Sequence, residues 1–328
     1  MSKKIEISHR TIIFTVFLGL FLWFLYQIRT ILLVLFISLI LMSALNPSVK
    51  KLEQLRIPRW LAILMIYLLI LAVVVLAIGG IIPPLIDQTS TLINQIPFIL
   101  EKFKVLGVDE KLIASQISQF TTIPANILKF IFNVFSNVVT ILGLIVITFY
   151  MLMERGNLDK YLVLLFGEDK EKEVKAIIDQ IEYRLGGWVR GELALMSFVG
   201  VLSYIGYRIV GLEFALPLAI LAFVFEILPN IGPTIAALPA ILIGLTVSPV
   251  QALVVAGVAF FIQQVENSIL VPRVMKKAAG VNPLVSILAL AIGFKLAGLG
   301  GAILAIPTFI ALEVIFSAIS SSKRFKEA

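Results

Sequence analysis

Apolar residues in this chain gather into long runs that contain no charged side chain and are separated by short polar stretches. Four runs in the amino-terminal half cover 11–27, 30–49, 60–86 and 130–153. Each approaches or exceeds the roughly 20 residues that a helix needs to cross the hydrocarbon core of a bilayer. The pattern therefore predicts four membrane-spanning helices in this half.

Shorter apolar runs follow in the carboxyl-terminal half, where 193–207 predicts a fifth spanning helix. The remaining runs cover 214–228, 234–247, 250–270, 284–297 and 299–318. Several hold only about 14 residues, which is short for a span. We therefore expect helical hairpins over 214–247 and 284–318, either re-entrant or built as ordinary spanning pairs. The predicted fold is all-α and polytopic, with about eight membrane segments.

Two more polar stretches carry apolar residues at helical spacing, which predicts amphipathic helices outside the hydrocarbon core. On the outer face, 87–126 suits a vestibule, an oligomer contact or a lid packed on the protein's own surface. On the inner face, an apolar stripe from Val174 to Trp188 predicts a helix that lies in the membrane interface and ends at Gly186 and Gly187.

Composition and charge also indicate a membrane protein. The chain is 60% hydrophobic and 14% charged, with a mean hydropathy of +1.05, which a single water-soluble core cannot accommodate. If the amino terminus is cytoplasmic, 20 of the 27 basic residues fall on the cytoplasmic side. We therefore expect a multi-pass protein of the cytoplasmic (inner) membrane with both termini inside. The net charge of +7 reflects this topology rather than nucleic-acid binding.

The sequence lacks the residues on which many enzymes and metal sites depend. It contains no cysteine and a single histidine, His9, which excludes disulfides, zinc sites and cysteine nucleophiles. No Gly-x-Ser-x-Gly, Walker A or Rossmann pattern is present. We therefore expect no catalysis, no cofactor and no bound metal.

A weak internal repeat marks the carboxyl-terminal half. Gly232 stands seven residues before Pro239, and Gly300 stands seven residues before Pro307. Each pair follows one longer apolar segment, and the number of crossings places the two units in opposite orientations. Inverted repeats of this kind are typical of secondary transporters, whose binding sites lie where broken helices meet.

The bend of the first hairpin is the first candidate site. Glu226 is followed there by Pro229, Asn230, Gly232 and Pro233. Prolines free backbone carbonyls, and a glycine lets another backbone or a ligand approach closely. A carboxylate at membrane depth costs a few kcal/mol. Glu226 should therefore face water, a partner or a substrate path, unless it caps neighbouring amides near the interface.

The end of run 250–270 holds the second candidate site. Its polar residues are Gln263, Gln264, Glu266 and Asn267, followed by Pro272 and Arg273. Gln263 and Asn267 are four residues apart and stack on one helix face, as the lining of a cavity would. Arg273 either belongs to this site or anchors the helix at the cytoplasmic surface. The residues that should let the hairpins bend and move are Pro229, Pro233, Pro239, Gly298, Gly300, Gly301 and Pro307.

These motifs resemble the autoinducer-2 exporter family of bacterial and archaeal membrane proteins. The resemblance rests on three stretches: Glu226-Ile-Leu-Pro-Asn-Ile-Gly-Pro233, Gln264-Val-Glu-Asn-Ser-Ile-Leu-Val-Pro-Arg-Val-Met275, and the tail from Gly-Val-Asn-Pro283 to Gly-Gly-Ala-Ile-Leu-Ala-Ile-Pro307. It implies a multi-pass inner-membrane permease. Some members of the family are associated with export of a quorum-sensing furanone and others with sodium/proton exchange.

We therefore expect a secondary transporter that works by alternating access and exports a small polar solute, such as a furanone of the autoinducer-2 type. The alternatives are a sodium or other cation/proton antiporter, with Glu226 or Glu266 exchanging ions and protons, and a membrane scaffold. The expected partners are the bilayer and a small-molecule or ion substrate, and a homo-oligomer is left open. The expected divisions are amino-terminal membrane helices (1–86), an extracytoplasmic segment (87–126), a membrane helix (127–153), cytoplasmic interfacial helices (154–192), a transport core (193–318) and a cytoplasmic tail (319–328).

Overall fold

The computed structural model describes residues 9–76, 79, 83, 87, 91, 138–229, 232–275 and 283–321. Within these residues all regular secondary structure is helical, and six helices are long and apolar enough to cross a membrane. Shorter apolar helices are also present among the described residues. The prediction of a polytopic all-α membrane protein is confirmed. The amphipathic segment predicted on the outer face lies outside the described residues, apart from isolated positions.

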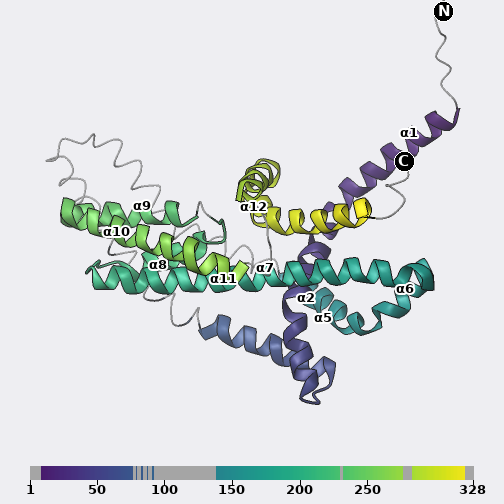
Figure 1. Ribbon diagram of the computed structural model, residues 1–328, viewed down its shortest axis with the longest axis horizontal. Coiled ribbons are helices and arrows are strands. Elements are labelled where there is room, and N and C mark those ends of the chain that lie inside the picture. Colours follow the sequence, from purple (N-terminus) through teal and green to yellow (C-terminus); the bar gives the residue numbers. More distant parts are fainter. Residues whose placement is uncertain are drawn as a thin grey trace, which may run out of the picture.

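The described helices of the first half overlap the predicted apolar runs. They are α1 (His9–Gln27), α2 (Arg29–Gln54), the helix Arg59–Leu76, α5 (Val138–Glu154), a 3₁₀ turn (Arg155–Asn157) and α6 (Leu158–Phe166). In Figure 1, α1 extends away from the rest of the chain, and its apolar side chains, such as Phe17 and Trp23, are mostly exposed. A helix that is apolar all round and unburied needs lipid as its solvent, so α1 supports the membrane assignment.

A single helix, α7 (Glu168–Ile209), runs the length of the molecule (Figure 1). Its 42 residues extend for about 63 Å at the usual helical rise. The predicted end of a separate interfacial helix at Gly186 and Gly187 is therefore wrong. A Cβ atom on Gly186 would lie 2.0 Å from the carbonyl oxygen of Ser43 in α2. The glycine is needed for the close approach of two helices, and it does not stop α7.

The crossing of α2 and α7 follows from a proline in α2. Pro47 has no N–H, so the carbonyl of Ser43, four residues earlier, lacks its helical donor. Arg190 of α7 reaches this place, and its Nη1 donates to the carbonyl oxygens of Ser43 at 3.3 Å and Ala44 at 3.0 Å. These hydrogen bonds from the guanidinium of Arg190 to carbonyl oxygens of α2 fix the position at which α7 crosses α2.

Replacement of Gly186 by alanine should separate these two helices. Because the new methyl group would meet backbone atoms of α2, we expect a cost of about 1–3 kcal/mol from overpacking, measured as a lower midpoint of thermal unfolding in detergent. Gly143→Ala in α5 is the matched control, since a Cβ there meets nothing within 4 Å. Equal stability of the two variants would contradict the close packing of α2 on α7.

The carboxyl-terminal half lies along α7 and forms the rest of the fold (Figure 1). Helix α9 (Gly232–Val247) packs on both α8 (Ala215–Phe225) and α10 (Pro249–Val265), and α8 and α10 pack on the carboxyl-terminal part of α7. Their core includes Tyr207, Leu218 and Val255. The chain continues through a π-helix (Glu266–Leu270), α11 (Val271–Met275) and α12 (Pro283–Ser321).

Two helical pairs joined by a bend lie in this half, namely α8 with α9 and the two limbs of α12. The first bend joins α8 to α9. The second lies inside α12 at Ala297 and Gly298, where Gly298 has φ +60°, a backbone conformation that favours glycine. The two limbs of α12 are in close contact, since a Cβ on Gly301 would lie 2.1 Å from the carbonyl oxygen of Gly293. Pro239 and Pro307, expected at points of bending, lie inside continuous helical segments.

Candidate functional site

Three buried glutamates come together where α7, the first bend and the π-helix meet. Glu192 is 3% exposed, Glu226 is 1% exposed and Glu266 is 2% exposed. The carboxyl groups of Glu226 and Glu266 are close neighbours, and Glu192 lies within electrostatic range of both. We call these three residues the carboxyl cluster. It unites one residue from each of the two candidate sites with a third from α7.

The tight turn after α8 places Glu226 in the cluster. Glu226 directly follows the last residue of α8, and the N–H of Gly232 donates to the carbonyl oxygen of Leu228 at 2.8 Å. A Cβ on Gly232 would lie only 1.8 Å from the carbonyl oxygen of Phe225. Only glycine allows α9 to begin so close to the end of α8. This glycine thereby holds Glu226 against the neighbouring helices.

A π-helical turn places Glu266, which is its first residue. Pro272 explains the irregularity, because it lacks the N–H that would bond the carbonyl of Ser268 in a regular α-helix. Such π-turns are frequent at functional sites, since they redirect side chains within a helix. Gln263, one turn earlier, donates from Nε2 to Oε2 of Glu266 at 3.4 Å. This long hydrogen bond brings the side-chain amide of Gln263 to the carboxyl cluster.

The surroundings of the carboxyl cluster favour a bound proton. A carboxylate has only acceptors, so two neighbouring carboxyl groups can bond to each other only when one of them carries a proton. The charged neighbours of the three groups are one another, and none forms an ion pair within the described residues. Several like charges without counter-ions cannot all be buried in a medium of low dielectric constant. The arrangement is therefore suited to take up and release protons.

Other predicted residues lie away from this cluster. The polar residues of the second candidate site therefore separate into two sets. Glu266 is buried and contacts Gln263, whereas the exposed residues are Gln264, Asn267, Pro272 and Arg273. The remaining first-bend prolines flank the turn: Pro229 is half-buried and Pro233 stands in the first turn of α9. Asn230 lies outside the described residues.

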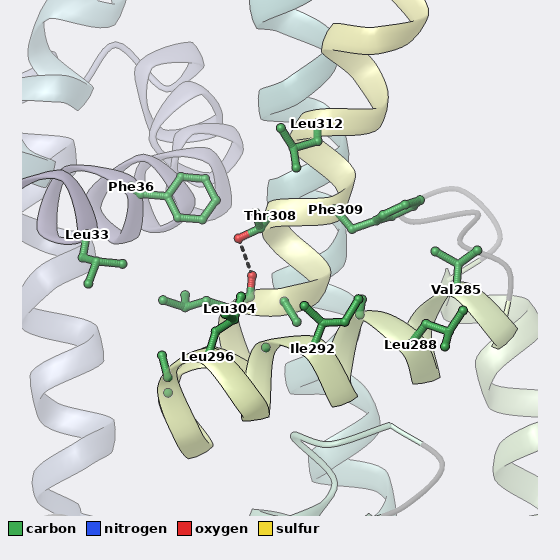
Figure 2. Close-up of a pocket in the computed structure, with 16 residues that line it drawn as sticks. Leu33, Phe36, Val285, Leu288, Ile292, Leu296, Leu304, Thr308, Phe309 and Leu312 are labelled. Carbon is green, nitrogen blue, oxygen red and sulfur yellow. Dashed lines mark hydrogen bonds between the residues drawn. The ribbon is translucent and has the colours of Figure 1, made fainter. Parts of the chain in front are cut away.

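The predicted glycines Gly300 and Gly301 line an apolar groove instead, and Gly298 lies at the bend beside it. Figure 2 shows the groove, of about 700 Å³, between Leu33 and Phe36 of α2 and the two limbs of α12. The hydroxyl of Thr308 in the groove donates to the carbonyl oxygen of Leu304 at 2.7 Å. In this structure, only the first of the two bends supplies a side chain to the carboxyl cluster.

The two halves nevertheless touch close to the first bend. Leu228, two residues after Glu226, packs against a core formed by α2, α7 and both limbs of α12. That core includes Leu185, Leu290 and Ile306. A displacement of α12 would therefore reach the bend that carries Glu226.

Glu192 was not singled out by the sequence pattern. It lies directly before the apolar run that starts at Leu193, in a stretch whose many charges predicted an interfacial helix. The sequence does contain an indication, because placing a carboxylate one residue from a spanning run in contact with lipid costs free energy. The packing of the other helices on α7 buries this residue in the interior.

The described residues contain no group of three histidine, cysteine, aspartate or glutamate side chains arranged to hold a metal ion. The three carboxyl groups of the cluster do not make up such a group.

Comparison with known proteins agrees with a transport role for this architecture. The sequence profile described as "AI-2E family transporter" matches residues 12–321. Among similar proteins, "Putative transport protein YueF" of Bacillus subtilis is 30% identical, over 89% of this chain and 85% of its own length. "Putative transport protein YrrI" of the same organism is 29% identical, over 88% of this chain and 86% of its own length. The chain therefore belongs to the AI-2E transporter family of multi-pass membrane proteins.

Proposed function

We propose that this protein is a proton-coupled secondary transporter and that the carboxyl cluster is its proton-binding site. The observation that carries the proposal is the burial of the neighbouring carboxyl groups of Glu226 and Glu266 with no ion-pair partner among the described residues, an arrangement that favours a proton held between them. A substrate that displaces this proton is coupled to its movement, because both cannot occupy the same oxygens. Cation/proton antiport follows most directly from three acidic side chains.

Export of a small polar solute, such as a furanone of the autoinducer-2 type, is the second candidate. The amide of Gln263 beside Glu266 favours it, since a neutral solute needs hydrogen-bond donors as well as acceptors. The same proton site would drive this export. The candidates differ in which molecule replaces the proton.

The test is transport by the purified protein in liposomes under a pH gradient. Sodium, potassium and a furanone are supplied in turn, and internal pH is followed with a fluorescent dye. Proton movement that depends on sodium or potassium supports antiport, and movement that depends on the furanone supports export. A protein that moves protons with none of these would leave the scaffold hypothesis as the better one.

We also propose that the protein lies in the cytoplasmic membrane with both termini in the cytoplasm, because basic residues gather on one side. Since the chain has no cysteine, Ser321→Cys and Thr121→Cys can be labelled without background. In intact cells, an impermeant thiol reagent should label Thr121→Cys, which lies outside the described residues, and leave Ser321→Cys unlabelled. The opposite pattern would invert this topology.

A further inference from the structure

Glu192 has a different environment from the other two carboxyl groups. It is 3% exposed, and neither of its side-chain oxygens has a hydrogen-bond partner among the described residues. Glu226, of which only Oε2 is buried without a partner, has Glu266 as a close neighbour, and Glu266 accepts from Gln263. An ionised carboxylate without a partner is the most expensive group to bury. Glu192 therefore needs a proton of its own.

Among the described residues, no cation of the elements packed on this part of α7 forms an ion pair with Glu192, and Arg273 of α11 is exposed. The first bend and the π-helix present Glu226 and Glu266. Arg190, two residues before Glu192 on α7, donates to carbonyl oxygens of α2. Arg184 is paired with Glu313 of α12 at 2.8 Å. The basic groups on this stretch of α7 are thus engaged by α2 and α12.

We propose that Glu192 is a second proton-binding site, so that the carboxyl cluster carries two exchangeable protons, one on Glu192 and one shared by Glu226 and Glu266. The proposal rests on the proposed function and defines its stoichiometry. Release of both protons leaves three adjacent carboxylates, which attract a cation or a hydrogen-bond donor. Uptake of both restores a neutral Glu192 and the shared bond, and the substrate is expelled.

This arrangement has a consequence for the charge moved in each cycle. If two protons exchange for one monovalent cation, one net charge crosses the membrane per turnover. If two protons exchange for a neutral solute, two charges cross. In both cases transport depends on membrane potential as well as on the pH gradient, whereas one proton exchanged for one monovalent cation moves no net charge.

Infrared spectroscopy of the purified full-length protein tests the proton on Glu192 without any substrate. The C=O stretching band of a protonated carboxyl group lies at a different frequency from the bands of a carboxylate. We expect Glu192→Gln to remove one component of this band at neutral pH and Glu192→Asp to retain it at a shifted position. Glu313→Gln is the matched control and should leave the band unchanged, because Glu313 is ion-paired with Arg184 and partly exposed. A band that is the same in the wild type and in Glu192→Gln would overturn the proposal.

Correct folding is checked by a monodisperse elution profile. If Glu192→Gln does not fold, the comparison of the wild type with Glu192→Asp decides: a shifted component supports the proposal, and an unchanged band overturns it.

The stoichiometry is measured in liposomes with sodium or potassium as the probe. The proton-to-cation ratio, obtained from the pH gradient that just balances a known cation gradient, should fall from two in the wild type to one in Glu192→Gln. An unchanged ratio would contradict a second exchangeable proton. If the wild type moves no protons with any probe, the proposed function fails, while the infrared band still reports whether Glu192 binds a proton.

Discussion

Replacement of Glu266 or of Glu226 by glutamine is expected to reduce proton-coupled transport to the level of empty liposomes. Glutamine keeps the size and the hydrogen-bonding capacity of glutamate but cannot bind and release a proton in this pH range. Both residues are buried in contact with each other, so either change removes the shared proton. Removing a buried charge without changing size should leave membrane insertion and thermal stability close to those of the wild type.

The matched control is Glu213→Gln, since Glu213 is exposed between α7 and α8 and should not affect transport. Glu266→Asp should retain part of the activity, with an altered pH dependence, because it keeps a carboxyl group in a shifted position. Normal transport by both glutamine variants at every pH would show that the cluster is structural. The assay is the pH-gradient experiment in liposomes described above.

Gly301→Leu should destabilise the fold, whereas Gly300→Leu should not. Gly301 faces the other limb of α12, where a Cβ would lie 2.1 Å from the carbonyl oxygen of Gly293. Gly300 lines the apolar groove, and a Cβ there meets nothing within 4 Å. We therefore expect Gly301→Leu to separate the limbs, at a cost of about 3 kcal/mol or more. Gly300→Leu should fold with a thermal midpoint near that of the wild type.

Transport separates a structural role of this groove from a mechanistic one. If α12 moves against α2 during the cycle, leucine at Gly300 fills the space between them and should abolish transport by a folded protein. Leu253→Ala, on the exposed face of α10, is a control for a change of apolar surface. Full transport by Gly300→Leu would show that the groove does not close. Gly232 is unsuitable for this test, because its replacement would disturb the tight turn at Phe225.

The helices could be predicted from the sequence because each apolar run is both long and free of charge. The boundaries of α1, α8, α9 and α10 follow from these runs within a few residues. The bend at Gly298 is visible in the same way, as the point that divides two apolar limbs. Glu226 and Glu266 also stand out from the sequence alone, because a carboxylate in an apolar segment is costly unless it has a function.

Tertiary structure decided which of these residues meet. In the sequence, the Gly186-Gly187 pair predicts the end of a helix, but α7 continues through it because it packs against α2. Pro47 of α2 leaves a carbonyl without its helical donor, and Arg190 donates to the carbonyl oxygens at this place. The residues near Gly186 in sequence contain no information about the packing of α2. Neither the continuity of α7 nor the buried position of Glu192 could therefore be predicted from them. The carboxyl cluster likewise joins positions 192, 226 and 266, which are brought together by packing between helices. Sequence therefore determined the elements and two of the three acids, whereas the contacts between helices determined the site.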